Sequence, residues 1–501
     1  MSARADALAS WHDDWSGLRV AVLGLGMTGF SVADTLVELR AVPLVLAGAA
    51  DEDRERILRV LGVETIVREG LTEVPAELEA FDPELVIASP GFRPSHPILR
   101  WAEERGLPIW GDLELAWRLR DKFGQEPKWL AVTGTNGKTT VTQMAAHMAK
   151  QAGLRVAPCG NIGIPILDAI RDPAAFEVLV VECSSYQLHS TRTMAADAAI
   201  VTNLADDHLD WHGSAEAYRA AKGVVYERAK TACIYNLADE ATRRLVEEAD
   251  VEEGCRAIGV GLGAPGPSDF GIVDGLLVDR AFLEDRRHRA LELATVAELR
   301  EAGLAAPHLV YDVLAAAALV RAIGVEPADV RDAALSFRVD RHRAEPVAEL
   351  DGVLFVDDSK ATNAHAADAA LAASEHVVWI LGGLLKGVDI SPLVAKHAPR
   401  LRAAVVIGVD RAPVLAALAE HAPDVPVVPI EVEDTGRVMP EAVAAARRLA
   451  QPGDVALLAP AAASMDQFDS YGDRGEKFAA AVREAVEGAA DDAATSDDAE
   501  R

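Results

Sequence analysis

Residues Thr133–Thr140 read TGTNGKTT and decide how the rest of the chain is interpreted. A short apolar run precedes them and a helical pattern follows, which is the context of a phosphate-binding loop. Gly134 and Gly137 let the backbone turn its N–H groups toward phosphate oxygens, Lys138 can bridge the outer phosphates, and the Thr139 hydroxyl can bind Mg²⁺. Two residues separate the glycines, fewer than in the generic loop, and a GK[ST] also occurs by chance. The order of strand, glycines and helix nevertheless predicts nucleotide binding.

Runs of Val, Leu and Ile alternate with amphipathic stretches along the whole chain, a pattern typical of parallel sheets with crossover helices. At ~150 residues per domain, the length of the chain predicts about three domains. We predict an α/β protein with a Rossmann-like N-terminal domain, a central P-loop ATPase-type parallel sheet and a Rossmann-like C-terminal domain. The predicted domains are residues 1–125, 126–336 and 337–488, and residues 489–501 form an acidic tail that we expect to be disordered.

The composition excludes several classes of protein. Among 501 residues, 49 basic and 79 acidic side chains give a net charge of −30, which disfavours non-specific binding to nucleic acid or to an anionic membrane. The longest apolar run, Val313–Val320, is far shorter than the ~18 residues of a membrane span, and the N-terminus lacks an apolar signal. Four cysteines without a CxxC pair suit a reducing compartment. We therefore expect a cytoplasmic protein that binds small molecules.

A second glycine-rich turn, GLGMTG at residues 24–29, has the form of a dinucleotide-binding fingerprint. An NAD site also requires an acid at the end of the second strand, where this chain has Ala47, with Asp51 as the nearest acid. The turn therefore favours a ligand that carries a diphosphate, which need not be NAD. A tight turn without a ligand is the alternative.

Two further stretches contain residue types that bind metal ions. VECSSYQL places Glu182 at the end of an apolar strand, where a P-loop sheet brings a carboxylate to the Mg²⁺ of the nucleotide. NLADDHLD contains His208, whose neutral imidazole is a metal ligand, although its aspartates also fit the caps of a turn. Lys222, in the following helix, by itself indicates only a solvated residue.

Three turns in the C-terminal third follow predicted strands: VDDSKATN, LGGLLKG and APAAASMDQFDSYGDRG. Ligands of open α/β sheets bind at the carboxyl ends of strands, so the three turns are expected to converge on one site. Lysines and hydroxyl groups in these turns are suited to a small dicarboxylate, and they come from Lys360, Lys386, Thr362 and Ser464.

Taken in order, these motifs resemble those of the Mur ligases from about residue 18 to residue 487. GNIG, SSYQL, the stretch DDHLD…YRAAK and DRHRAEP belong to the same set. The resemblance implies that ATP phosphorylates the terminal carboxylate of UDP-N-acetylmuramoyl-L-alanine and that an amine then attacks the acyl phosphate to form an amide. DSKATN with SMDQF resembles the member that adds D-glutamate. The expected partners are therefore the small-molecule substrates UDP-N-acetylmuramoyl-L-alanine, D-glutamate and ATP, and the expected state is a monomer.

The resemblance also implies a role for individual residues. The expected catalytic residues are Lys138, Glu182, His208 and Lys222. ATP is expected at Gly134, Thr135, Asn136, Gly137, Lys138, Thr139, Thr140, Arg343 and Asp358, with His342 beside them. The UDP substrate is expected at Met27, Thr28, Ser89, Gly91 and Asn161, and D-glutamate at Thr362, Lys386, Ser464 and Tyr471, with Lys360 adjacent. The expected Mg²⁺ ligands are Thr139, Glu182, His208 and Lys222, the last as a carbamate formed with CO₂.

One stretch departs from the family pattern. The family usually has His-Asn at the start of a helix near the adenine and a second Asn three residues later, whereas residues 308–312 here read HLVYD. The sequence leaves two alternatives open. The first is another ligase on the same fold, which adds a different amino acid or extends a folate. The second is a nucleotide-binding protein or NAD oxidoreductase without ligase chemistry.

Overall fold

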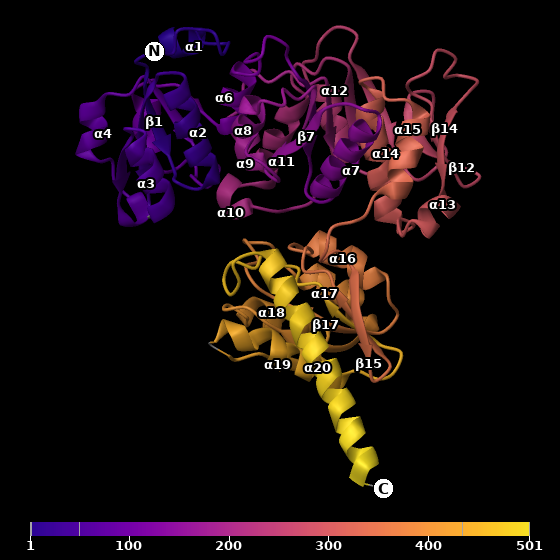
Figure 1. Cartoon of the computed structure of the whole chain (residues 1–501). Coiled ribbons are helices and arrows are strands. Elements are labelled where there is room, and N and C mark those ends of the chain that lie inside the picture. The colour runs from indigo at the N-terminus through magenta and orange to yellow at the C-terminus, as the bar shows by residue number, and fades with distance from the viewer. Residues whose placement is uncertain (1–2, 50, 433, 500–501) are drawn as a thin grey trace. The chain divides into compact units, whose positions relative to one another are not determined.

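The computed structural model describes residues 3–49, 51–432 and 434–499, with side chains through residue 489. Contacts divide the chain into two compact units, the first made of residues 1–204 and 216–338 and the second of residues 205–215 and 339–501. Three β-sheets with helices on their faces carry the fold, two in the first unit and one in the second (Figure 1). The predicted α/β class with three mainly parallel sheets is confirmed, and the exact domain boundaries stay a prediction.

The N-terminal sheet has the strand order β3-β2-β1-β4-β5, and all its pairs are parallel. Since β1 pairs with both β2 and β4, the direction of winding reverses at β1, and ligands of such sheets bind outside the strand ends at this reversal. The elements are β1 (Arg19–Leu23), β2 (Val42–Ala47), β3 (Glu64–Val67), β4 (Leu85–Ala88), β5 (Ile109–Trp110), α1 (Ala3–Ala7), α2 (Met27–Glu38), α3 (Glu52–Val60), η1 (Glu69–Leu71), α4 (Ala76–Phe81), α5 (Pro97–Glu104) and α6 (Asp112–Arg118).

The central sheet has the order β14-β13-β12-β11-β10-β9-β6-β8-β7, in which β6 lies between β9 and β8. The loop TGTNGKTT follows β6, so the ends of β8 and β9 flank it. The strands are β6 (Lys128–Thr133), β7 (Val156–Gly160), β8 (Val178–Glu182), β9 (Ala198–Val201), β10 (Ala232–Asn236), β11 (Arg256–Val260), β12 (Asp269–Val273), β13 (Leu276–Asp279) and β14 (Leu291–Thr295). The helices are α7 (Lys138–Gln151), α8 (Ile166–Arg171), α9 (Ser185–His189), α11 (Ala215–Gly223), η2 (Val224–Tyr226), α12 (Glu240–Glu248), α13 (Val296–Glu301), α14 (Pro307–Arg321) and α15 (Pro327–Ser336).

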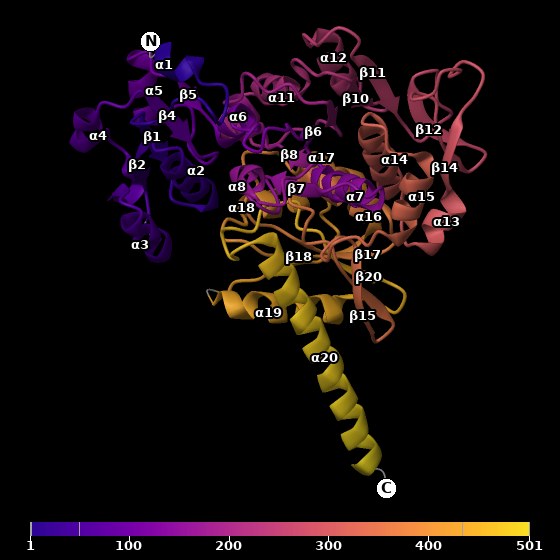
Figure 2. The same ribbon diagram turned by 45° about the horizontal axis from the view of Figure 1, so that its top comes forward.

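The apolar run Val313–Val320 is the centre of helix α14, and every residue in it is buried. A helix that is apolar on all sides needs neighbours on all sides, and α14 packs against both α7 and α15 (Figure 2). The alanines of α14 allow the neighbouring helices to approach closely, so the core around this helix can be packed densely without large aromatic side chains. The same packing fixes α7, the helix that begins at the phosphate loop.

The C-terminal sheet has the order β15-β16-β20-β17-β18-β19, with only β15 antiparallel to its neighbour. The three turns noted in the sequence follow β16, β20 and β17, which are adjacent, so the expected convergence of these turns is confirmed. The elements of this unit are β15 (Glu345–Leu350), β16 (Val353–Asp357), β17 (Val377–Leu381), β18 (Leu401–Val406), β19 (Val427–Pro429), β20 (Val455–Leu458), α10 (Leu209–His212), α16 (Ala364–Ala372), α17 (Ser391–His397), η3 (Ala398–Arg400), α18 (Ala412–His421), α19 (Thr435–Leu449) and α20 (Tyr471–Ala499).

The expectation of a disordered tail from residue 489 is wrong for most of that segment, because α20 continues as one helix to Ala499. Low hydrophobicity and acidic charge argued for disorder, but the segment is also rich in alanine, the residue with the highest helix propensity. An existing helix can propagate through such a sequence without the cost of a new nucleus.

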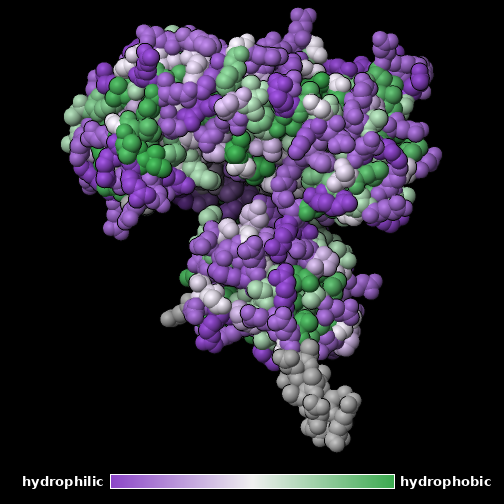
Figure 3. All heavy atoms as spheres, in the orientation of Figure 1, coloured by the Kyte–Doolittle hydropathy of each residue, from purple (hydrophilic) through white to green (hydrophobic). Residues whose placement is uncertain are grey.

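The face of the molecule drawn in Figure 3 is mostly hydrophilic, with apolar residues scattered between charged ones. In the part of the chain that the structure describes, no helix is long and apolar enough to cross a membrane.

Candidate active site

The loop TGTNGKTT has the backbone geometry that a phosphate loop requires. Gly134 has φ +145°, and a Cβ atom there would lie 2.0 Å from Oγ1 of Thr202 on the neighbouring strand end. Gly137 has φ +80° and is the residue immediately before α7. Glycine is therefore required at both positions. At Gly134 a side chain would collide with Thr202, and at Gly137 the backbone before the helix has a left-handed conformation that other residues rarely adopt. The loop directs the free N–H groups of α7 toward an anion.

Residues at the end of β9 hold the loop in this shape. The backbone N–H of Asn136 donates to Oδ1 of Asn203 at 2.9 Å, and the amide of Asn203 donates back to the Asn136 carbonyl at 3.1 Å. Thr202 Oγ1 also donates to the Asn136 carbonyl at 2.5 Å, and the Thr135 N–H donates to the Asn203 carbonyl. The sequence analysis assigned no role to Asn203, although this residue opens the quoted stretch NLADDHLD. Its position just after an apolar strand was the one feature that could have marked it as a candidate site residue.

Lys138 and Thr139 begin α7 at the mouth of this loop. Lys138 Nζ donates to the Thr135 carbonyl at 2.9 Å, so its ammonium lies back over the loop. Thr139 is 7% exposed and Thr140 is buried, so both side chains are shielded from bulk solvent. The structure thus brings the predicted ATP residues of the loop together.

Substitution of Gly134 by alanine is expected to lower ATP-dependent activity at least about tenfold, because the new methyl group would collide with Thr202 and displace a loop whose geometry orients the phosphates. The matched control is Gly153→Ala, since Gly153 also has a positive φ of +83° but nothing lies within 4 Å of a Cβ there. Kinetic assays of both variants check this expectation. Equal activities would show that the collision at Gly134 is unimportant.

Glu182, at the end of β8, is 2% exposed. Its Oε1 accepts a hydrogen bond from the Asn161 side chain at 2.8 Å, while its Oε2 is buried and has no hydrogen-bond partner among the described residues. A buried carboxylate oxygen without a donor is costly unless a cation or water binds it. The residues present therefore fit a divalent cation, with Glu182 as one ligand. Asn161, expected near the UDP substrate, here orients Glu182.

Lys222 is buried, which contradicts the simple interpretation of a solvated helix residue. Its side chain is 2% exposed, and Nζ donates to the Gly134 carbonyl at 2.8 Å and to Thr133 Oγ1 at 3.3 Å. Thr133 Oγ1 in turn donates to the carbonyl of Cys183, the residue after Glu182, at 2.7 Å. The aromatic ring of Tyr218 lies 4.8 Å from Nζ. Lys222 thus supports the base of the phosphate loop, near the strand end that carries Glu182.

The stretch HLVYD, which departs from the family pattern, forms part of α14 beside the phosphate loop. Tyr311 donates through its hydroxyl to the Thr202 carbonyl at 3.0 Å, and burial raises its pKa well above the usual range. Asp312 is 5% exposed, and its Oδ1 would lie 2.9 Å from a Cβ atom on Gly137. Tyr311 thus supports the strand end that holds the loop, and Asp312 lies beside Gly137 of the loop.

In the N-terminal sheet, the turns after β1 and β4 lie against each other. A Cβ on Gly24 would lie 2.6 Å from Ser89 Oγ, and a Cβ on Gly29 would lie 2.0 Å from the Gly24 carbonyl. Met27 is 64% exposed and Gly91 is also exposed, so both remain accessible to a ligand. The structure brings together the two turns that contain four of the residues predicted for the UDP group, which are Met27, Thr28, Ser89 and Gly91.

In the second unit, a buried arginine joins the turns after β16 and β20. Arg474 is fully buried, and its guanidinium donates to Ser359 O at 2.8 Å, Ser359 Oγ at 2.9 Å and Ala462 O at 3.1 Å. Burial lowers the pKa of Arg474 to about 10. Lys360 Nζ lies 3.8 Å from the ring of Tyr471, the first residue of α20. Arg474 lies in the quoted motif SYGDRG, but sequence reasoning did not identify its role.

The remaining residues of the predicted amino-acid site differ in exposure. Ser464 is 4% exposed and Thr362 is partly buried. Lys386 has a left-handed backbone, with φ +54°, and its Nζ lies 3.3 Å from Oδ1 of Asp207. Asp207 belongs to the segment 205–215, which clusters with the C-terminal sheet and not with the rest of the central region. His208 is therefore in the second unit, whereas Thr139, Glu182 and Lys222 are in the first.

The residues near the expected ATP contact of the second unit form a polar cluster. His342 Nδ1 and Asp357 Oδ2 are 2.6 Å apart, and the backbone N–H of His342 donates to Glu345 Oε2 at 2.9 Å. One ligand atom from each of these three side chains lies within 4.8 Å of the others, and the His342 and Asp357 side chains are already joined to each other. Burial raises the pKa of the neighbouring Asp358 to about 6, although the charge of Arg343 opposes this shift.

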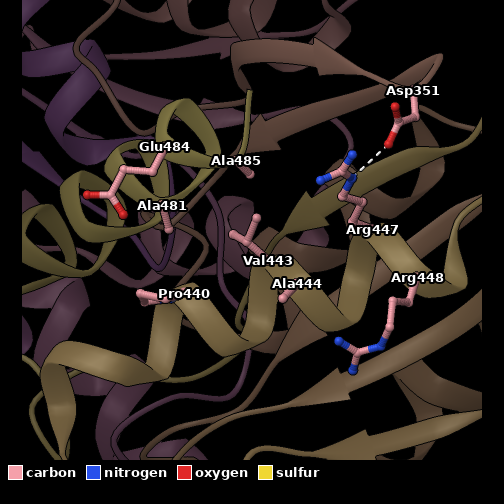
Figure 4. Close-up of a pocket in the computed structure, with 9 residues that line it drawn as sticks. All are labelled: Asp351, Pro440, Val443, Ala444, Arg447, Arg448, Ala481, Glu484 and Ala485. Carbon is pink, nitrogen blue, oxygen red and sulfur yellow. Dashed lines mark hydrogen bonds and ion pairs between the residues drawn. The ribbon is translucent and has the colours of Figure 1, made fainter. Parts of the chain in front are cut away.

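A pocket of ≈ 620 Å³ lies elsewhere in the second unit, between α19 and α20 (Figure 4). Its charged lining includes Arg447, which donates to Asp351 at 2.7 Å, together with Arg448 and Glu484. None of the predicted site residues lines it. The pocket contains charges of both signs, and two of them already pair with each other, so it does not favour an anionic ligand such as ATP.

Comparison with known proteins covers nearly the whole chain. A model of the Mur ligase middle domain matches residues 132–320, and a model of the Mur ligase, glutamate ligase domain matches residues 342–462. A UDP-N-acetylmuramoylalanine–D-glutamate ligase of Leifsonia xyli is 60% identical over 98% of this chain and 97% of its own length. The corresponding ligase of Streptomyces coelicolor is 53% identical over 94% of this chain and 99% of its own length.

Solved structures show the same fold at low identity. A UDP-N-acetylmuramate–alanine ligase from Thermotoga maritima has a TM-score of 0.53 and 19% identity, and it covers 93% of this chain and 100% of its own. A murein peptide ligase from Psychrobacter arcticus has a TM-score of 0.52 and 16% identity over 93% of this chain and 98% of its own.

Proposed function

This chain belongs to the Mur ligase family, and from that premise we propose that it joins D-glutamate to UDP-N-acetylmuramoyl-L-alanine in the synthesis of peptidoglycan precursors. It is an ATP-dependent ligase, and the curated relatives at 53–60% identity over nearly the whole chain are named UDP-N-acetylmuramoylalanine–D-glutamate ligase. The observation that carries the proposal is the phosphate loop with Lys138 at its mouth and Lys222 at its base, close to the end of the strand that carries Glu182.

The reaction needs two steps, because a carboxylate is a poor electrophile. A carboxylate oxygen of the UDP-linked substrate attacks the γ-phosphorus of ATP, so an acyl phosphate forms and ADP leaves. The amine nitrogen of D-glutamate, after loss of a proton, attacks the acyl carbon and gives a tetrahedral intermediate. The nitrogen then loses a second proton to solvent, and collapse of the intermediate breaks the C–O bond, releases phosphate and leaves the amide. Both steps concentrate negative charge, which preorganised cations and N–H donors stabilise.

Each part of the loop has a role in this scheme. The N–H groups at the start of α7 hold the β- and γ-phosphates, and Lys138 neutralises charge on the transferred group. Family members use ATP and Mg²⁺; the ion, when bound, neutralises phosphate charge and polarises the phosphoryl oxygen. We propose Thr139 as a ligand of the Mg²⁺ that accompanies ATP, His208 as a residue near a second metal ion, and Glu182 and a carbamate on Lys222 as further metal ligands. The single N–H left on a carbamylated Lys222 can still donate to the Gly134 carbonyl.

The UDP substrate and D-glutamate bind, in this proposal, at the strand ends of the N-terminal and C-terminal sheets. The UDP group lies against the adjoining turns after β1 and β4, and Asn161 approaches the sugar from the central sheet. We propose Arg343 and Asp358 as further ATP-binding residues. D-glutamate is held by a cation and by hydroxyl groups at the ends of β16, β17 and β20, which are Lys386, Thr362, Ser464 and Tyr471. We propose that the enzyme acts as a monomer in the cytoplasm, since both ATP and the UDP-sugar are found there.

Measurement of phosphate release with ATP and UDP-N-acetylmuramoyl-L-alanine, with and without D-glutamate, tests the proposal. We expect release to depend on D-glutamate and to be lost when Mg²⁺ is removed by a chelator. Turnover with meso-diaminopimelate, L-lysine or a folate instead would favour another ligase on this fold. Absence of D-glutamate-dependent release under any condition would contradict the proposal.

A further inference from the structure

Lys386, the cation expected to bind the amino acid, already contacts a carboxylate of the chain itself. Its Nζ lies 3.3 Å from Asp207 Oδ1, and the two side chains are 22% and 8% exposed. Both residues belong to the second unit, Lys386 in the turn after β17 and Asp207 in the segment 205–215. An ion pair so little exposed to water is only weakly screened.

A substrate carboxylate and Asp207 present the same chemical group to one ammonium. If both remained on Lys386, two negative charges would lie within a few ångströms of each other in a poorly hydrated site, where their repulsion is strong. We propose that Asp207 is an internal competitor: it holds Lys386 when no amino acid is bound, is displaced by a carboxylate of D-glutamate, and thereby sets the affinity for that substrate. This inference rests on the proposed function.

Asp207 has contacts that can retain it after Lys386 is released. The backbone N–H of His208 donates to Asp207 Oδ1 at 2.9 Å, and His208 Nε2 lies 3.6 Å from Asp207 Oδ2. Asp207 therefore does not depend on Lys386 alone for its hydrogen bonds. When the substrate replaces Asp207 on Lys386, the free-energy cost is smaller than that of leaving a buried carboxylate without any partner. Lys386, on a short turn with φ +54°, is likewise held by its backbone and not only by the ion pair.

The test is Asp207→Asn, which removes the charge and keeps the shape of the side chain. The apparent dissociation constant of a ligand is its intrinsic value divided by the fraction of molecules able to bind it. If about one molecule in ten has Lys386 free, the KM for D-glutamate is expected to fall about tenfold in the variant, while the KM for ATP is unchanged. Asp206→Asn, at the exposed neighbour, is the matched control and is expected to change neither value.

Binding must also be measured apart from turnover, because Asp207 precedes a proposed metal ligand. D-glutamate is titrated calorimetrically into full-length enzyme saturated with UDP-N-acetylmuramoyl-L-alanine and a non-hydrolysable ATP analogue, and tighter binding to Asp207→Asn is expected. Unchanged binding would overturn the proposal, and weaker binding would show that Asp207 assists the substrate. If the wild-type enzyme shows no D-glutamate-dependent turnover at all, the proposed function fails instead, so the two failures are distinguishable.

Discussion

Replacement of Lys138 by methionine is expected to lower D-glutamate-dependent phosphate release by at least about 100-fold. Methionine is close to lysine in length but carries no charge. The Lys138 ammonium lies over the loop, 2.9 Å from the Thr135 carbonyl, which is where the outer phosphates of ATP are expected. Its loss leaves the charge that develops during phosphoryl transfer without this cation. Initial-rate measurements at saturating ATP separate this effect on kcat from weaker binding.

The matched control is Lys150→Met, at the exposed end of the same helix α7. It removes the same charge from the same element, so it is expected to keep nearly full activity. Thermal unfolding of both variants checks that α7 remains folded. Activity of Lys138→Met within threefold of the wild type would show that TGTNGKTT does not bind the transferred phosphate.

Substitution of Lys222 by alanine is expected to abolish most activity and also to destabilise the protein. The side chain is 2% exposed, so its loss leaves a cavity and removes the donor to the Gly134 carbonyl. An unsatisfied buried acceptor costs about 1–3 kcal/mol. If Lys222 acts as a carbamate, acetate or another short acid is expected to restore part of the activity, because it returns a carboxylate to the vacated space.

The decisive comparison is between activity and stability, since a purely structural lysine would not respond to acetate in this way. Restoration of phosphate release without restoration of the unfolding temperature supports a carboxylate role. Carbon-13 NMR of wild-type enzyme with labelled bicarbonate gives an independent signal for the carbamate. Lys230→Ala, at an exposed position after η2, is the control. Undiminished activity of Lys222→Ala without any acid would remove Lys222 from the site.

The local sequence pattern was enough to predict the alternation of apolar strands with amphipathic helices, the phosphate loop and the order of the motifs. Gly134 and Gly137 lie where the spacing predicted, and Glu182 ends a buried strand next to the loop. Such features depend on residues close together in the chain, whose conformations are limited by sterics and by alternation of apolar side chains. The resemblance to the Mur ligases added the residue roles, which remain to be tested.

Features that depend on distant segments could not be predicted in this way. Asn203 and Tyr311 both support the phosphate loop through contacts with residues far away in sequence, and Arg474 ties two turns through Ser359. Asn203 and Arg474 lie within quoted motifs, but the sequence does not show which distant residues these side chains contact. Their importance arises only from their neighbours in the folded chain.

The sequence by itself therefore determined the class of fold, the location of the phosphate loop and the family. Only the tertiary structure decided that Lys222 is buried at the base of this loop, that the segment 205–215 packs with the C-terminal sheet, and that Asp207 contacts Lys386. The physical reason is the range of the forces involved. Backbone sterics and apolar periodicity act over a few residues, whereas burial and charge pairing depend on which distant segments the fold brings together.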